Sequence, residues 1–194
     1  MPVCKKPDTP IYLLVSLLAW TTMLASTVAL ADFRVKEIRA VLEQGNITLS
    51  GTLDLVLSSK VEEAVAKGIP LDMEFEFRLK RERKLLWAER LKQWKLKRQI
   101  YYHALSGQYF VHDPADKGKK LDNFTSLQRA LLHMGTLNEF SIDVASVTQV
   151  DASYVLDVRV SLDIESLPAP LRPVAYTSLD WRLNSGWTTW TVER

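Results

Sequence analysis

The stretch that decides the fold runs from Leu71 to Lys80 and reads LDMEFEFRLK in one-letter code. Its apolar residues occupy every second position, and charged residues lie between them. Because successive side chains of a β-strand point to opposite faces, this alternation predicts a strand with one buried face and one wet face. The same pattern recurs over residues 47–57 and 154–164. Strands of this kind favour antiparallel sheets over a buried parallel sheet.

Turn residues join these runs at hairpin spacing. Gly45-Asn46 and Ser106-Gly107 each lie between two strand-like runs, as expected for tight β-hairpins. Together the patterns predict an α+β fold that is mainly β. It would be an antiparallel β-sandwich or a curled sheet of about eight strands with two short helices. We expect residues 32–194 to form one domain.

The two helices have recognisable starts. Ser59 and Glu62 are spaced as a capping box and predict a helix that ends near Gly68. Thr125 and Gln128 have the same spacing and predict a second helix before Gly135.

The first 31 residues have the order of a secretory signal peptide. Lys5 and Lys6 precede an uncharged apolar stretch, Ile11–Leu30, and small residues at Ala29 and Ala31 follow the pattern that signal peptidase accepts. We therefore expect cleavage between Ala31 and Asp32 and export to the periplasm. The alternative is an uncleaved helix that anchors the domain in the inner membrane, because about 20 uncharged residues can span a bilayer.

Cysteine use restricts the chemistry of the exported part. Cys4 is the only cysteine of the chain and lies before the apolar stretch. The domain over 32–194 therefore has no cysteine, which excludes a disulfide, a thiolate metal site and a cysteine nucleophile. We expect no cofactor, and the sequence contains no metal-binding or catalytic motif.

The most distinctive feature is the segment Arg78–Arg98, which we call the basic arm. It has ten basic residues against Glu82 and Glu89, a net charge of +8 in a chain whose total is +2. The strand Leu71–Leu79 is predicted to turn near Leu85–Leu91 and to return as a hairpin. The predicted contact residues of this arm are Arg81, Arg83, Lys84, Trp87, Arg90, Trp94, Lys95, Lys97 and Arg98.

Two interpretations of the basic arm stay open. It could bind an anionic envelope component or the acidic face of an envelope protein, with charges acting at range and tryptophans making contact. Alternatively, the charges protect an exposed strand edge from aggregation. Nucleic acid would match the same charges, but we expect no nucleic acid to meet an exported protein.

The remaining polar residues indicate structural roles. His103, His112 and His133 lack the short spacing of a local metal site, and Asp157 and Asp163 are interpreted as the solvated face of a strand. Among the aromatic residues, Trp181, Trp187 and Trp190 are expected to pack in the core or to seal two sheets together, and stacking on an aromatic ligand is the alternative.

The chain resembles a proteobacterial secreted family of unknown function, the domain-of-unknown-function 4390 family. The resemblance rests on four blocks and a closing stretch between Trp181 and Trp187; the blocks are residues 101–111, 124–131, 154–163 and 167–172. It implies a secreted or envelope-associated bacterial protein and supplies no catalytic residues. Genes of this family are described as neighbours of a nitrogen-regulation type sensor kinase, which implies an accessory role in envelope signalling by association only.

We therefore expect a non-enzymatic periplasmic domain that binds a partner through the basic arm. One alternative is an envelope-acting hydrolase whose site is assembled from dispersed Asp, Ser and His residues. A concave pocket with His103 or His133 beside a carboxylate would favour it, and a solid core with a convex basic arm would not. The other alternative is a structural domain anchored by the uncleaved N-terminal helix.

Overall fold

The computed structural model of the 194-residue chain describes residues 32–83, 87–113, 121–146, 149 and 152–194. The predicted signal segment and the predicted contact residue Lys84 lie outside the described residues. In chain order the elements are β1 (Phe33–Glu43), β2 (Asn46–Leu55), α2 (Ser59–Ala66), β3 (Leu71–Arg81), β4 (Glu89–His103), β5 (Gln108–His112), β6 (Asp122–Phe124), α3 (Leu127–Met134), β7 (Thr136–Asp143), β8 (Tyr154–Leu162), α4 (Arg172–Thr177) and β9 (Thr188–Glu193). None of the described helices is long and apolar enough to cross a membrane.

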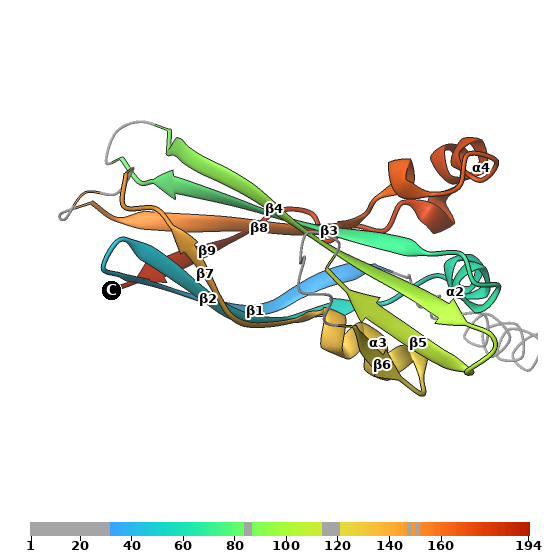
Figure 1. The fold of residues 1–194 in the computed structure, drawn as a ribbon. Helices are drawn as coiled ribbons and strands as arrows, with labels where there is room; N and C mark the ends of the chain where they lie inside the picture. Colours follow the sequence, from blue (N-terminus) through green and yellow to red (C-terminus); the bar gives the residue numbers. More distant parts are fainter. Residues whose placement is uncertain (1–31, 84–86, 114–120, 147–148, 150–151) are drawn as a thin grey trace, which may run out of the picture. The chain divides into compact units, whose positions relative to one another are not determined.

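The described strands form one strongly curled sheet, a half-barrel, in the order β6-β5-β4-β3-β8-β9-β1-β2-β7 (Figure 1). Neighbouring strands pair antiparallel, except that β1 and β9 run parallel over two residue pairs. The prediction of a mainly β, curled sheet with two short helices is confirmed, with α2 and α3 as the helices. The parallel contact was not predicted, because it joins the first and last strands of the domain.

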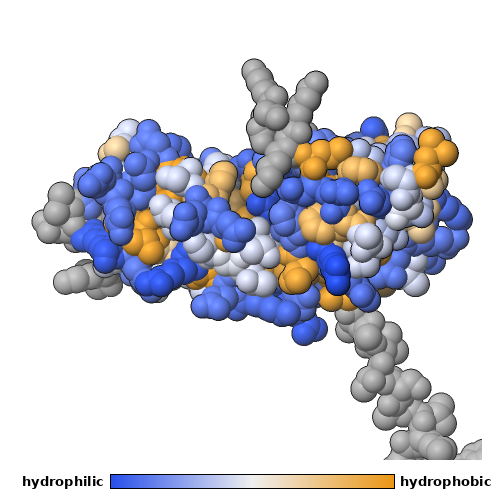
Figure 2. All heavy atoms as spheres, turned by 60° about the horizontal axis from the view of Figure 1, so that its bottom comes forward, coloured by the Kyte–Doolittle hydropathy of each residue, from blue (hydrophilic) through white to orange (hydrophobic). Residues whose placement is uncertain are grey.

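The core lies on the concave side of the sheet. β3 contributes five apolar side chains with no exposed surface, and they are the alternate residues of the stretch that predicted the strand: Leu71, Met73, Phe75, Phe77 and Leu79. Apolar residues of β2 and β8 complete this interior. On the side that carries α3 and β6, Figure 2 shows apolar residues in small separate patches among hydrophilic ones.

Both predicted hairpin turns are present. Gly45, between β1 and β2, has a φ of 81°, and Gly107, between β4 and β5, has a φ of 66°. These left-handed backbone conformations favour glycine, because a side chain would clash there. Near the C-terminus, Trp181 ends a 3-10 turn and β9 begins at Thr188.

Both helices are capped by a different residue from the one predicted. The side chain of Ser58, not Ser59, accepts a hydrogen bond from the Val61 amide at 3.2 Å. The side chain of Ser126, not Thr125, accepts one from the Arg129 amide at 3.4 Å. In each case two adjacent hydroxyl residues could serve as the N-cap, and the capping-box pattern selected the one that does not.

Candidate functional site: the β3–β4 hairpin

The register of β3 and β4 assigns each residue of the basic arm to one face of the sheet. Residues directly opposite each other in an antiparallel pair share a face. Lys92 opposes Leu79 and Arg98 opposes Met73, so these two cations lie on the inner, apolar face. Lys95 opposes Glu76 and lies on the outer face. The cations of the basic arm therefore do not form one surface.

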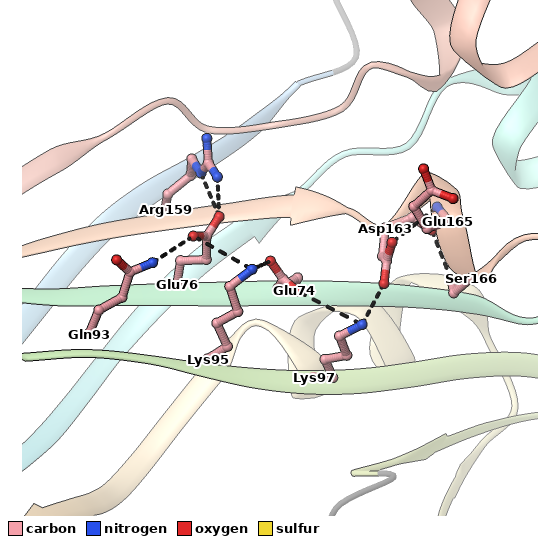
Figure 3. Close-up of polar contacts among 9 residues, drawn as sticks. All are labelled: Glu74, Glu76, Gln93, Lys95, Lys97, Arg159, Asp163, Glu165 and Ser166. Atoms are coloured by element: carbon pink, nitrogen blue, oxygen red, sulfur yellow. Dashed lines mark hydrogen bonds and ion pairs between the residues drawn. The ribbon is translucent and has the colours of Figure 1, made fainter.

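A network of ion pairs lies on the outer face, with Glu76 at its centre (Figure 3). We call it the outer lattice; its members are Glu74, Glu76, Lys95, Lys97, Arg159 and Asp163. Although this side chain is only 3% exposed, its carboxylate accepts a hydrogen bond from Arg159 Nε at 3.0 Å and one from Gln93 Nε2 at 3.3 Å. Lys95 Nζ lies 3.9 Å from the same carboxylate and 2.6 Å from a carboxylate oxygen of Glu74. A buried carboxylate that loses its partner costs about 3–5 kcal/mol. These cations are therefore part of the fold.

Lys97 extends the lattice toward the end of β8. Its Nζ lies 2.6 Å from a carboxylate oxygen of Asp163 and 3.8 Å from one of Glu74. The hydrogen bond to Asp163 raises the pKa of Lys97. Because both cations of this part of the arm are more than one-third exposed, each pair contributes at most about 1 kcal/mol to stability.

Asp157 on β8 is buried, which corrects its interpretation as a solvated strand residue. The residue is 3% exposed, forms an ion pair with Lys80 and accepts a hydrogen bond from the Thr189 hydroxyl at 2.8 Å. The alternation of β8 was correct, but β9 and the lysine of β3 cover this position. One more cation of the basic arm is thus held by a carboxylate of the same chain.

Trp187 lies against two arginines of the outer face. The guanidinium carbon of Arg78 is 3.7 Å from the centroid of the indole ring, and that of Arg159 is 4.7 Å away. Cations over an indole face are attracted by its quadrupole, by about 0.5–2 kcal/mol. Trp187 is half-buried and is a partner of the basic arm, which corrects the expectation that it packs in the core.

The two inner cations cap backbone carbonyls across the open side of the half-barrel. Lys92 Nζ donates to the Asp143 carbonyl at 2.5 Å, at the end of β7. The Arg98 guanidinium donates to the carbonyls of Met134 at 2.6 Å and Thr136 at 2.8 Å. Burial lowers the pKa of Arg98. Strands that are far apart in the sheet order are thus joined through side chains of β4.

Trp94 belongs to the interior. Its ring stacks on Phe77, with centroids 5.7 Å apart and an interplanar angle of 15°. The ring of Phe77 in turn stacks on that of Phe140 of β7, with centroids 6.3 Å apart. The indole nitrogen of Trp94 is buried and has no hydrogen-bond partner among the described residues. This arrangement indicates packing between β4 and β7.

The residues near the hairpin turn are in a different environment. Trp87 is 93% exposed, and Arg90 is also exposed. Arg81 and Arg83 both form ion pairs with Glu89. Hydrogen bonds from Arg83 and Arg81 hold the pKa of Glu89 below its usual value. We call Arg83, Trp87 and Arg90 the tip.

A separate cleft of about 250 Å³ lies on the inner side, between β4, β5, α3 and β7. We call it the seam cleft; among its lining residues are Leu96, Arg98, Asp122, His133, Asn138 and Phe140. His133 Nε2 is 3.1 Å from a carboxylate oxygen of Asp122. This pair was not predicted, because the two residues lie eleven positions apart and neither is in a motif.

The other histidines are placed differently. His103 is exposed and its Nδ1 lies 3.0 Å from the Ser106 hydroxyl in the β4–β5 turn. His112 lines the seam cleft, and its buried Nδ1 has no hydrogen-bond partner among the described residues. Within the described part of the chain, no group of three or more His, Cys, Asp and Glu residues could hold a metal ion.

The outer lattice could have been found from the sequence. Period-two patterning puts Glu74 and Glu76 on the polar face of β3, and the same patterning groups Lys95 with Lys97 on β4. Pairing the two strands as a hairpin would have set carboxylates opposite ammonium groups. The net charge of the basic arm concealed this pairing, because residues 78–98 do not include Glu74 and Glu76 of the neighbouring strand.

The comparison with known families covers almost all of these elements. The model of the family described as Domain of unknown function (DUF4390) matches residues 31–191. The chain belongs to the DUF4390 family. No curated protein and no solved structure matches it.

The DUF4390 match confirms the family resemblance seen in the sequence. It spans the whole β3–β4 hairpin, the seam cleft and β8. The family description assigns no activity, so the function of this DUF4390 chain has to be argued from the site.

Proposed function

We propose that this DUF4390 protein is an exported, non-enzymatic domain that binds an anionic partner in the cell envelope through the tip. The observation that carries the proposal is Trp87, which is 93% exposed between arginines at the end of a hairpin. Tryptophan and arginine are the residues most enriched at the energetic centres of protein interfaces. A large exposed indole has no stabilising role in the fold.

The partner is an envelope protein with an acidic face or another anionic envelope component. The supporting charges are those of the tip, where Arg90 is exposed and Arg83 pairs with Glu89, whose side chain is itself 36% exposed. The cations of the stem, the paired residues of β3 and β4, contact less exposed carboxylates, an indole or backbone carbonyls of the same chain. Export by the N-terminal segment and a periplasmic location are parts of this proposal. An accessory role in envelope signalling would agree with them.

Photo-crosslinking in cells tests the proposal. Benzoylphenylalanine at position 87 should give a discrete adduct, and the same residue in place of Leu132 should not. Leu132 is a matched control because it is also an exposed apolar residue, at 63%, but lies on α3. Absence of an adduct at position 87, or equal adducts at both positions, would contradict the proposal.

Charge reversal at the tip provides a second arm of this test. Arg83→Glu combined with Arg90→Glu should remove the adduct, whereas Arg129→Glu on α3 should leave it intact. The reversal excludes Lys95 and Lys97, because these lysines hold Glu74 and Asp163 in the outer lattice. Because Arg83→Glu removes the ion pair with Glu89, the urea midpoint of the double variant is compared with that of the parent, and an unchanged midpoint assigns the lost adduct to binding.

A hydrolase that acts on envelope material is the second candidate, and the His133–Asp122 pair favours it. A carboxylate that orients an imidazole is the usual support of a general base. The described hydroxyl of the seam cleft, that of Thr136, donates to the Leu132 carbonyl at 2.8 Å, so His133 would act on water. His133→Gln should then abolish hydrolysis of cell-wall or envelope substrates by the purified protein.

Sequencing the N-terminus of the protein recovered from cells tests export. We expect it to begin at Asp32. A chain that retains Ile11–Leu30 would instead favour the third reading, a structural domain held at the inner membrane by its N-terminal helix.

A further inference from the structure

The first ten residues of β4 form a strand edge that is unpaired among the described residues. Their partner on one side is β3, over Met73 to Arg81. On the other side, β5 pairs only with residues 99–103 of β4. In Figure 1 the half of β4 nearest the hairpin turn has only β3 beside it in the sheet. On that side, backbone donors and acceptors along 89–98 have no strand partner among the described residues.

We propose that this edge accepts an extended acidic segment of the partner as an additional β-strand. The inference rests on the proposed binding role of the hairpin and names the chemistry of its partner. Addition of a strand to an exposed edge supplies affinity through main-chain hydrogen bonds and specificity through alternate side chains. The tip would then lie at one end of a longer contact.

The charges of β4 select for such a segment. On the outer side of this edge Arg90 is exposed, and Lys95 and Lys97 remain 51% and 43% exposed beside their carboxylates. Two copies of this edge repel each other, which is the usual protection against edge-to-edge aggregation. An acidic strand does not meet that repulsion. The protective interpretation and the binding interpretation of the basic arm are therefore compatible.

The inner face of the edge adds an apolar requirement. Leu96 faces inward, opposite Phe75, and lines the seam cleft together with Val111 and Phe140. Since side chains of an added strand alternate between faces, every second residue would point toward the inner side, and those opposite Leu96 would lie beside this cleft. The segment that fits is therefore extended, with acidic residues on the outer side and apolar residues on the inner side.

A synthetic peptide tests the proposal directly. The probe is a labelled ten-residue peptide of alternating glutamate and valine, and the protein is used as recovered from cells. Binding is followed by fluorescence anisotropy and by hydrogen exchange of the amides in 89–98. We expect protection of about half of these amides, because alternate residues of a strand hydrogen-bond to each side.

Matched peptides separate strand pairing from charge attraction. A peptide with alternate N-methylated amides keeps its charges but cannot complete the ladder, and it should bind at least about tenfold more weakly. A lysine–valine peptide should not bind. Equal binding of the N-methylated peptide, or no protection of 89–98, would overturn the proposal.

Protein variants and self-association complete the test. Arg90→Glu should weaken peptide binding about tenfold, and Arg129→Glu should not change it. A dimer formed through 89–98 in sedimentation would overturn the proposal, because it would show that a second copy occupies the edge. If the peptide fails while position 87 still crosslinks a partner, the strand inference is wrong and the proposed role of the tip stands.

Discussion

The stem and the tip of the β3–β4 hairpin have similar residues in opposite circumstances. In the stem, the paired residues of β3 and β4, Lys95 lies 3.9 Å from the buried carboxylate of Glu76, and Arg78 stacks on Trp187. Arg159 of the neighbouring strand β8 contacts the same carboxylate. At the tip, Arg90 and Trp87 are exposed. The difference teaches that a run of positive charge in a sequence is not by itself a binding surface. Which cations are available depends on the strands that lie beside them.

The largest effect should come from removing Arg159, the β8 arginine that holds Glu76 of the stem. Arg159→Met leaves the buried Glu76 with only Gln93 and a distant Lys95, so we expect a loss of about 3 kcal/mol in the free energy of unfolding. Urea-induced unfolding measures it, with Arg90→Met at the tip as the matched control. The control should change stability by less than about 0.5 kcal/mol. Equal effects of the two variants would remove the distinction between stem and tip.

An intermediate effect is expected on the inner face. Arg98→Met removes the donors to the Met134 and Thr136 carbonyls but preserves much of the side-chain volume. The expected loss is about 1.5–3 kcal/mol, the range for hydrogen bonds to charged groups. Hydrogen exchange should quicken in α3 and β7 more than in β8. A uniform change over the domain would show that Arg98 does not join β4 to this region.

Trp87→Ala should have almost no effect on stability. The exposed ring lacks the burial that makes core aromatics costly to remove, so the change in unfolding free energy should stay within about 0.5 kcal/mol. Capture of the partner in cells should nevertheless be lost. A destabilised Trp87→Ala protein would show that the ring packs on the fold in solution.

The smallest effect concerns pH. The pKa of Glu89 is lowered in the folded state by Arg83 and Arg81, so its contribution to stability is present above its unfolded pKa. That contribution is lost as the pH falls through the folded pKa. Glu89→Gln should therefore be slightly less stable than the parent at neutral pH and equal to it in acid. A difference that grows in acid would have the wrong sign.

The sequence predicted the elements that depend on local pattern. The alternation over 71–80 located β3 and its inner face, and Gly45 and Gly107 located two hairpin turns. It did not predict the parallel contact of β1 with β9, or the burial of Asp157 by a strand far along the chain. Those features depend on which strands become neighbours, and period-two patterning contains no information about neighbours.

Some features of the candidate site could likewise be predicted from local pattern, and others could not. The exposed tryptophan of the tip was named from the sequence, because charge and aromatic residues are visible there. The pairing of Lys80 with Asp157, and the inward direction of Lys92 and Arg98, required the register of the sheet. The seam cleft required the curl of the sheet as well, since its lining comes from both ends of the strand order.

The availability of each arginine can be measured residue by residue. The folded protein is treated with phenylglyoxal, which reacts with accessible guanidinium groups, and each site is followed over time by mass spectrometry. We predict that Arg90 reacts at least about ten times faster than Arg78, Arg98 and Arg159, because these three are held by an indole, carbonyls and a carboxylate. If any of these three arginines reacts as fast as Arg90, the distinction between held and available cations is wrong.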